Sequence, residues 1–306
     1  MTSIFLNFPI SKNKNMRIKD YLLISVTTML AYSCGSEATQ PNDNPTTNAT
    51  PVDTIIKEPE LVENDLETLR FRLDMLVANH GAAPVSMLMK LSADDKDVFH
   101  PDYVNDVSNV GLYKDDFSTA LNFGVYKTDL IYDLIHHHLD DGLNARNAAN
   151  TLADALWEEH IYSDGDIEKY RAAQDNLEDL ESLLFQDYEK TEKYLISHDQ
   201  FEIATLTMIG SLIESMYFTS KAIEEFGMTE SKYDLLINEK HQLDEFVELL
   251  AFFKGNEKDA ALLEGLMEVE DAYGKINGKE DLTDEVIKHI DTAVFALRGK
   301  IVSNNV

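Results

Sequence analysis

Residues 200–227 read QFEIATLTMIGSLIESMYFTSKAIEEFG, and the spacing of their apolar side chains decides the fold class. Apolar residues recur three or four positions apart, as on one face of an α-helix, at Ile203, Leu206, Ile209 and Ile213. Just before them, Ser197 and Gln200 have the spacing of a capping box, in which a serine hydroxyl and a glutamine side chain satisfy free amides of the first turn. We therefore predict a long helix that begins at this cap and ends at Gly227.

The same periodicity continues through most of the chain after Glu60. All seven prolines precede residue 102, and a proline-free stretch of this length favours helices. We predict an all-α bundle of about eight or nine helices in residues 60–306, either as one body or as two halves that meet near residues 162–166. Besides the helix above, the predicted helices lie at 66–79, 85–91, from 117 through 135, around 152–157, and at 167–196, 233–253, 258–273 and 284–302.

The N-terminal segment predicts a secreted protein. Residues 16–34 read MRIKDYLLISVTTMLAYSC, in which two basic residues precede an apolar stretch too short to be a good membrane-spanning helix. Its end resembles a lipobox, where bacterial signal peptidase cleaves before a cysteine that then carries lipid, although Tyr32 is bulkier than the usual residue there. Cys34 is the only cysteine of the chain. We predict a signal peptide over residues 1–33, with Met1 or Met16 as its start, and lipidation of Cys34; the alternative is a plain secretory signal.

Residues 34–59 predict a flexible tether, because they are rich in Thr, Asn, Pro and Ser and lack apolar periodicity. Within this tether, Asp53-Thr54-Ile55 resembles the O-glycosylation motif of periplasmic Bacteroidota proteins, which predicts a glycan on Thr54. Gly35 stands where an aspartate favours inner-membrane retention of Gram-negative lipoproteins, and Glu37 resembles the acidic surface-export signals of Bacteroidota lipoproteins. We therefore predict a protein of the cell envelope, anchored in the outer membrane and facing the periplasm or the surface.

The charge balance excludes one class of partner. The chain has 26 Lys and Arg against 56 Asp and Glu, a net charge of −30, so nucleic-acid binding is strongly disfavoured. Residues 1–33 carry four basic residues and one acidic residue, so their removal leaves −33. Anionic lipid headgroups repel such a body, so acyl chains must hold it to the membrane. A single cysteine also excludes an intrachain disulfide and a cysteine-cluster metal site.

Two segments share one pattern, a glycine followed by an acid and then by a tyrosine three residues after the acid. They are residues 123–132, FGVYKTDLIY, and residues 209–217, IGSLIESMY. A glycine inside a helix costs about 1 kcal/mol against alanine, which favours a close approach of two helices there. The polar residues predict either a buried cluster that binds a ligand or side chains that satisfy one another across a helix crossing, and we favour the second. The cluster comprises Tyr126, Asp129, Tyr132, Glu214 and Tyr217.

Residues 122–132, NFGVYKTDLIY, and residues 210–217, GSLIESMY, also resemble a family of Bacteroidota outer-membrane lipoproteins with all-helical bodies. In that family the segments read approximately Asn-x-Gly-Val-Tyr-x-x-Asp-Leu-x-Tyr and Gly-x-x-Ile/Val-Glu-x-x-Tyr. The resemblance covers residues 70–225. It implies fold class and location, and no activity comes with it.

Metal and catalytic chemistry have little support. Residues 136–138 are all histidine, but three successive residues of a helix point about 100° apart and cannot converge on one metal. Residues 94–97 and 164–166 lack the ligand spacing of an EF-hand. No di-metal Glu-x-x-His pair and no hydrolase or phosphate-loop motif is found. One helix carries a polar stripe that we expect to be exposed or to face a partner, made of Asn122, Tyr126, Asp129, Asp133 and His136.

The sequence therefore predicts a lipid-anchored envelope protein that acts by binding or scaffolding, with no cofactor and no catalytic residue. Its expected partners are the membrane, through the lipid, and either an envelope protein or a small ligand. The alternative is a small-ligand or metal-binding lipoprotein that uses the Asp, Glu and Tyr cluster, and a hydrolase is a remote third.

Overall fold

A computed structural model describes residues 63–94, 98–157, 164–253, 255 and 257–306. The predicted signal peptide, the lipidation site Cys34, the tether and Thr54 lie outside the described residues, as do residues 158–163 beside the expected seam. Helices α2 to α11 belong to one compact unit.

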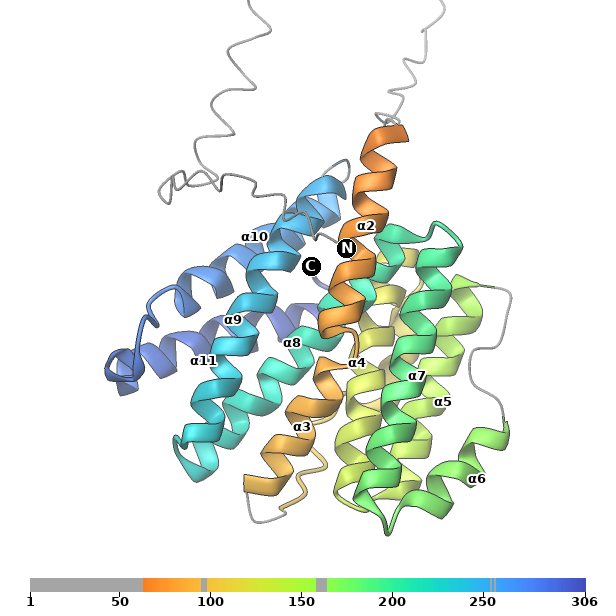
Figure 1. The fold of residues 1–306 in the computed structure, drawn as a ribbon, viewed down its shortest axis with the longest axis horizontal. Coiled ribbons are helices and arrows are strands. Elements are labelled where there is room, and N and C mark those ends of the chain that lie inside the picture. Colours follow the sequence, from red (N-terminus) through yellow and green to blue (C-terminus); the bar gives the residue numbers. More distant parts are fainter. Residues whose placement is uncertain (1–62, 95–97, 158–163, 254, 256) are drawn as a thin grey trace, which may run out of the picture. The chain divides into compact units, whose positions relative to one another are not determined.

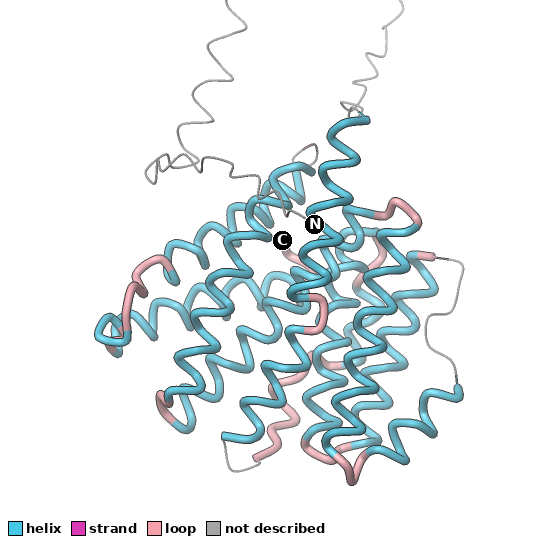
Figure 2. The backbone as a smooth tube through the Cα atoms, in the orientation of Figure 1, coloured by secondary structure: helices cyan, strands magenta, loops and turns pink. Residues whose placement is uncertain are grey.

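The described residues form ten α-helices and three short 3₁₀-helices, and they contain no strand (Figures 1 and 2). The predicted all-α fold is therefore confirmed. The α-helices are α2 (Glu63–His80), α3 (Ala83–Asp94), α4 (Asp116–Ile135), α5 (Leu139–Leu156), α6 (Asp164–Ala173), α7 (Leu177–Ser197), α8 (Phe201–Phe226), α9 (Glu230–Leu250), α10 (Glu257–Tyr273) and α11 (Asp284–Val302). The 3₁₀-helices are η1 (Val107–Leu112), η2 (Ala251–Phe253) and η3 (Lys279–Asp281).

One helix predicted from the sequence is divided into two helices in the structure. The helix expected over residues 167–196 is interrupted at residues 174–176, and α6 already begins at Asp164, where a break was expected. Asn176 caps α7, because its side-chain oxygen accepts hydrogen bonds from the backbone N–H groups of Glu178 and Asp179. Asparagine is a favoured N-cap residue, so this second start carried a local signal that apolar periodicity alone did not reveal.

The predicted capping box is also wrong. Ser197 is the last residue of α7, and its hydroxyl donates back to the carbonyl oxygen of Tyr194 at 2.8 Å. Gln200 precedes α8 without any side-chain cap hydrogen bond. Between them the chain turns at Asp199, whose φ of 60° is left-handed. Serine hydroxyls bond readily to nearby carbonyls, and here that alternative is the one adopted.

Helices α4 and α8 cross at the centre of the unit, with α5, α6 and α7 on one side and α9, α10 and α11 on the other (Figure 1). Every residue of α4 after Asp116 is buried. A helix buried all round must be covered on every side, and α3, α5, α7, α8 and α11 all contact it. At the crossing, a Cβ atom on Gly124 or Gly210 would come within 2.0 Å of a backbone oxygen of the other helix. The predicted close approach at these glycines is confirmed.

None of the described helices is both long enough and apolar enough to span a membrane.

Candidate functional site

Four of the five residues of the predicted polar stripe are buried in α4 against other parts of the chain, so the expectation that the stripe is exposed or faces a partner is wrong for them; the fifth, His136, is half-buried after the end of α4. Asn122, Tyr126 and Asp129 have no exposed surface, and Asp133 has almost none. The stripe is covered by the segment before η1 and by the end of α11. The Tyr126 hydroxyl donates to the carbonyl oxygen of Asp106 at 2.9 Å, and the N–H of Asn105 donates to Asp129 Oδ2 at 3.1 Å. The Asn122 amide donates to the carbonyl oxygen of Ile301.

Arg298 is the partner of the acid in the second of the two similar segments, Glu214. Its Nε and Nη2 atoms donate to the two carboxylate oxygens of Glu214 at 2.9 and 2.8 Å, and Nη2 also donates to the carbonyl oxygen of Tyr103. The guanidinium carbon lies 4.3 Å from the ring centroid of Tyr217. Burial raises the pKa of Asp129 well above its ordinary value, and the nearby Glu214 charge raises it further, so the protonated carboxyl is favoured.

The five predicted cluster residues therefore do not share one cavity. Asp129, Glu214 and Tyr217 gather around Arg298, and Tyr126 binds the covering segment. Tyr132 lies farther along α4, where its hydroxyl accepts a hydrogen bond from the N–H of His100 at 3.0 Å. These contacts tie α4, α8, α11 and residues 100–106 together. Sequence reasoning missed Arg298, because it is 84 positions from Glu214 and no local spacing connects the two.

A second buried network joins α4 to α7. Lys127 Nζ lies 2.7 Å from Glu192 Oε1, with both side chains 1% exposed, and 3.8 Å from the ring centroid of Tyr188. Burial lowers the pKa of Lys127 and raises the pKa of Glu192, and the attraction between them opposes both shifts. The Tyr188 hydroxyl is 2.9 Å from Thr128 Oγ1. No sequence pattern indicated this pair.

The three histidines lie in a turn, so the assumption that they continue a helix is wrong. Helix α4 ends at Ile135, with His136 as its C-cap, and His138 precedes α5. His137 has a left-handed φ of 63°, and the N–H of His138 reaches back to the carbonyl oxygen of Asp133, as at many helix ends. In the part of the chain that the structure describes, no group of three or more His, Cys, Asp or Glu side chains is placed to hold a metal ion.

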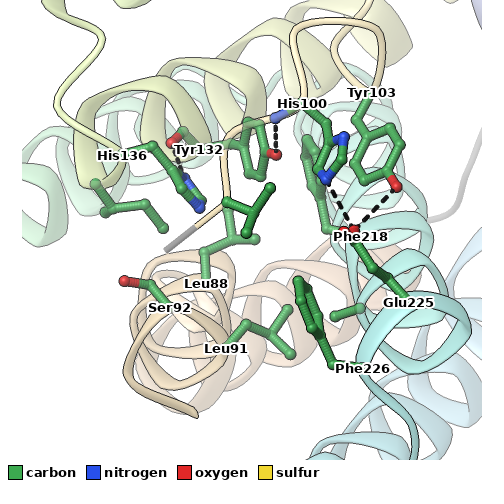
Figure 3. A pocket seen from close by; sticks show the side chains of 13 residues that line it. Leu88, Leu91, Ser92, His100, Tyr103, Tyr132, His136, Phe218, Glu225 and Phe226 are labelled. Carbon is green, nitrogen blue, oxygen red and sulfur yellow. Dashed lines mark hydrogen bonds and ion pairs between the residues drawn. The ribbon is translucent and has the colours of Figure 1, made fainter. Parts of the chain in front are cut away.

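A small pocket opens between α3, α8 and the C-terminal end of α4 (Figure 3). Its volume is about 40 Å³. The floor is made of side chains with at most 6% exposure, and these are Leu88, Leu91, Tyr132, Ile135 and Phe218. The rings of Tyr132 and Phe218 stack with their centroids 4.3 Å apart. Burial raises the pKa of Tyr132, so its hydroxyl keeps its proton.

The rim of the pocket is polar and partly exposed. His100 Nε2 lies 2.8 Å from Glu225 Oε2, and the Tyr103 hydroxyl donates to the same oxygen at 3.4 Å (Figure 3). The His100 and Tyr103 rings stack, with centroids 4.5 Å apart. Val98 and Phe226 complete the rim with large exposed apolar surfaces. An apolar floor below a few convergent polar groups is the usual form of a small-ligand site.

Of the residues singled out in the sequence, only Tyr132 and His136 line this pocket. The sequence did not indicate the others, because they come from three helices and from the loop before η1. Comparisons with protein families, with curated proteins and with solved structures found no match to this chain.

Proposed function

We propose that this protein is a lipid-anchored protein of the cell envelope, attached to the outer membrane, that acts by binding a small, mainly apolar ligand in the pocket between α3, α4 and α8. The anchor is supported by Cys34 at the end of the apolar N-terminal segment and by the polar tether that follows it. The resemblance of residues 122–132 and 210–217 to Bacteroidota lipoproteins supports the same location.

The observation that carries the binding function is the pocket itself. Its floor is apolar and withdrawn from solvent, and its rim holds the His100–Glu225 contact. A cavity needs about 10–15 Å³ of such volume to hold one water molecule. The pocket, with about 40 Å³, therefore has room for about three waters or for a short hydrocarbon group. The Asp129 and Glu214 carboxylates are a weaker candidate, because they are held by Arg298 and by the backbone of residue 105.

Mass spectrometry of the protein purified from native membranes tests the anchor. We expect a mature N-terminus at an acylated Cys34, and a Cys34→Ala variant should leave the membrane fraction. An unmodified N-terminus on soluble protein would overturn the lipoprotein assignment.

Ligand binding is tested by methyl NMR with a set of small alkyl and aryl compounds, both neutral and charged. We expect shifts confined to the methyl groups of Leu88, Leu91 and their neighbours. Ser92→Leu adds bulk to a residue that lines the pocket and should weaken binding, whereas Ser86→Leu, on the exposed face of the same helix, should not. Absence of binding by every compound would refute the proposed pocket function.

A further inference from the structure

One oxygen of the rim carboxylate is available to a ligand. Within the pocket Glu225 makes both of its contacts through Oε2, which lies near His100 Nε2 and accepts a hydrogen bond from the Tyr103 hydroxyl. Among the residues that the structure describes, Glu225 Oε1 has no hydrogen-bond or ion-pair partner. The Glu225 side chain is 31% exposed, so a charged ligand group can reach it while it remains partly hydrated.

The floor beneath this carboxylate suits hydrocarbon. Leu88, Leu91 and Phe218 are buried and present apolar atoms to the pocket. Each methylene moved from water into such a floor strengthens binding about fourfold, until the space is filled. A volume of about 40 Å³ admits a short chain only.

The negative charge of the protein favours a ligand whose polar end is a cation. The chain carries a net charge of −30, and a field of this sign attracts cations and repels anions. Tyr103 and Phe226 also contribute aromatic rings to the rim, but Lys221 and Lys232 already lie 5.4 Å from the centroids of these rings, so the carboxylate is the main attraction for an ammonium group.

We propose that the pocket binds a short alkylammonium compound, with its hydrocarbon part on the floor formed by Leu88, Leu91 and Phe218 and its ammonium group paired with Glu225 Oε1. This inference rests on the proposed ligand-binding function and names the chemical class of the ligand.

The test compares three probes that share one hydrocarbon chain: butylammonium, butanol and butyrate. In calorimetric titration of the purified protein, butylammonium should bind up to about fivefold more tightly than butanol, because a partly exposed ion pair adds up to about that much. Butyrate should bind most weakly. From ethyl- to propyl- to butylammonium, affinity should rise about fourfold per methylene and then level off as the floor is filled.

Two matched variants isolate the carboxylate. Glu225→Gln should remove the preference for butylammonium over butanol, while the glutamine oxygen still accepts from Tyr103. Glu224→Gln changes the net charge equally, but Glu224 is exposed, pairs with Lys221 and does not line the pocket, so the preference should remain. Circular dichroism checks that both variants are folded.

Different results would overturn the ammonium inference and the proposed ligand-binding function. Equal binding of butanol and butylammonium, or an unchanged preference in Glu225→Gln, would overturn the ammonium inference and leave the apolar pocket standing. Failure of every probe in the series to bind would overturn the proposed function together with this inference.

Discussion

Gly124 and Gly210 lie at the same crossing of α4 and α8, each against the backbone of the other helix. A Cβ atom on Gly124 would stand 2.0 Å from the carbonyl oxygen of Thr207, and one on Gly210 would stand 2.0 Å from that of Leu121. Ser211 Oγ donates across the crossing to the carbonyl oxygen of Gly124 at 3.1 Å. Because the crowding atoms belong to the backbone, a side chain here can be accommodated only by moving the helices apart.

Alanine at this crossing should therefore be destabilising. We expect Gly124→Ala or Gly210→Ala to lower the free energy of unfolding by about 1–3 kcal/mol, as overpacking of a core does. Gly299→Ala is the control, because Gly299 is an exposed residue of α11 with no atom near its Cβ position. It should raise stability by up to about 1 kcal/mol through helix propensity. Urea unfolding measures both changes, and the same sign for the two substitutions would contradict the argument.

Arg298 should be needed for stability because it pairs with the buried carboxylate of Glu214. Arg298→Met leaves Glu214 buried without its partner, and the free energy of unfolding should fall by about 3–5 kcal/mol. Adding Glu214→Gln to that variant removes the isolated charge and should restore part of the loss. A double-mutant cycle in urea checks this, and purely additive effects would show that the two side chains are not coupled.

Glu239 makes stability fall as the pH rises. It is buried beside Tyr273, whose hydroxyl donates to its Oε2 at 2.7 Å, and burial raises the pKa of Glu239 to about 7. Between the ordinary glutamate pKa of about 4.3 and this value, the folded state keeps a proton that the unfolded state has released. The Glu239 contribution to the free energy of unfolding therefore falls by up to about 1.4 kcal/mol per pH unit in that window, and is level above it.

Glu239→Gln removes this titration, so its stability relative to the wild type should increase between about pH 5 and about pH 8. Glu264→Gln, at an exposed position of α10, should leave the pH dependence of the wild type unchanged. Urea unfolding at a series of pH values measures the slopes, and parallel curves for Glu239→Gln and the wild type would contradict the prediction.

The start of α7 at Asn176, which the sequence did not predict, can be tested by comparing substitutions at Asn176 and at Ser197. Asn176 is exposed and accepts two backbone hydrogen bonds at the start of α7, so Asn176→Ala should cost about 1 kcal/mol. Ser197→Ala should change stability by much less, because the Ser197 hydroxyl bonds to the carbonyl oxygen of Tyr194 and to the exposed ring of His198 and caps no amide of α8. Thermal unfolding of the two variants compares them, and a larger loss for Ser197→Ala would favour the capping box after all.

The helices were largely predictable because their signal is local. The apolar spacing predicted residues 284–302, and α11 spans Asp284–Val302. The spacing also placed the end of α8 at Gly227, whose φ of 78° is a left-handed turn. The helix expected around residues 152–157 begins much earlier, at Leu139, and ends before Trp157. Two other errors arose at Asn176 and Ser197, where a short polar side chain can bond either to the following amides or to the preceding carbonyls. Apolar periodicity does not distinguish these two choices.

The sequence by itself determined the all-α class, most helix boundaries and the close approach at Gly124 and Gly210, because each depends on the spacing of neighbouring residues. Only the tertiary structure decided that the stripe of α4 is buried, that Arg298 holds Glu214, and that His100 and Glu225 meet above an apolar floor. The contacts of Asn122 with Ile301, of Glu214 with Arg298 and of His100 with Glu225 join residues between 84 and 179 positions apart. They depend on how whole helices pack against one another, and the spacing of residues along one helix carries no information about that.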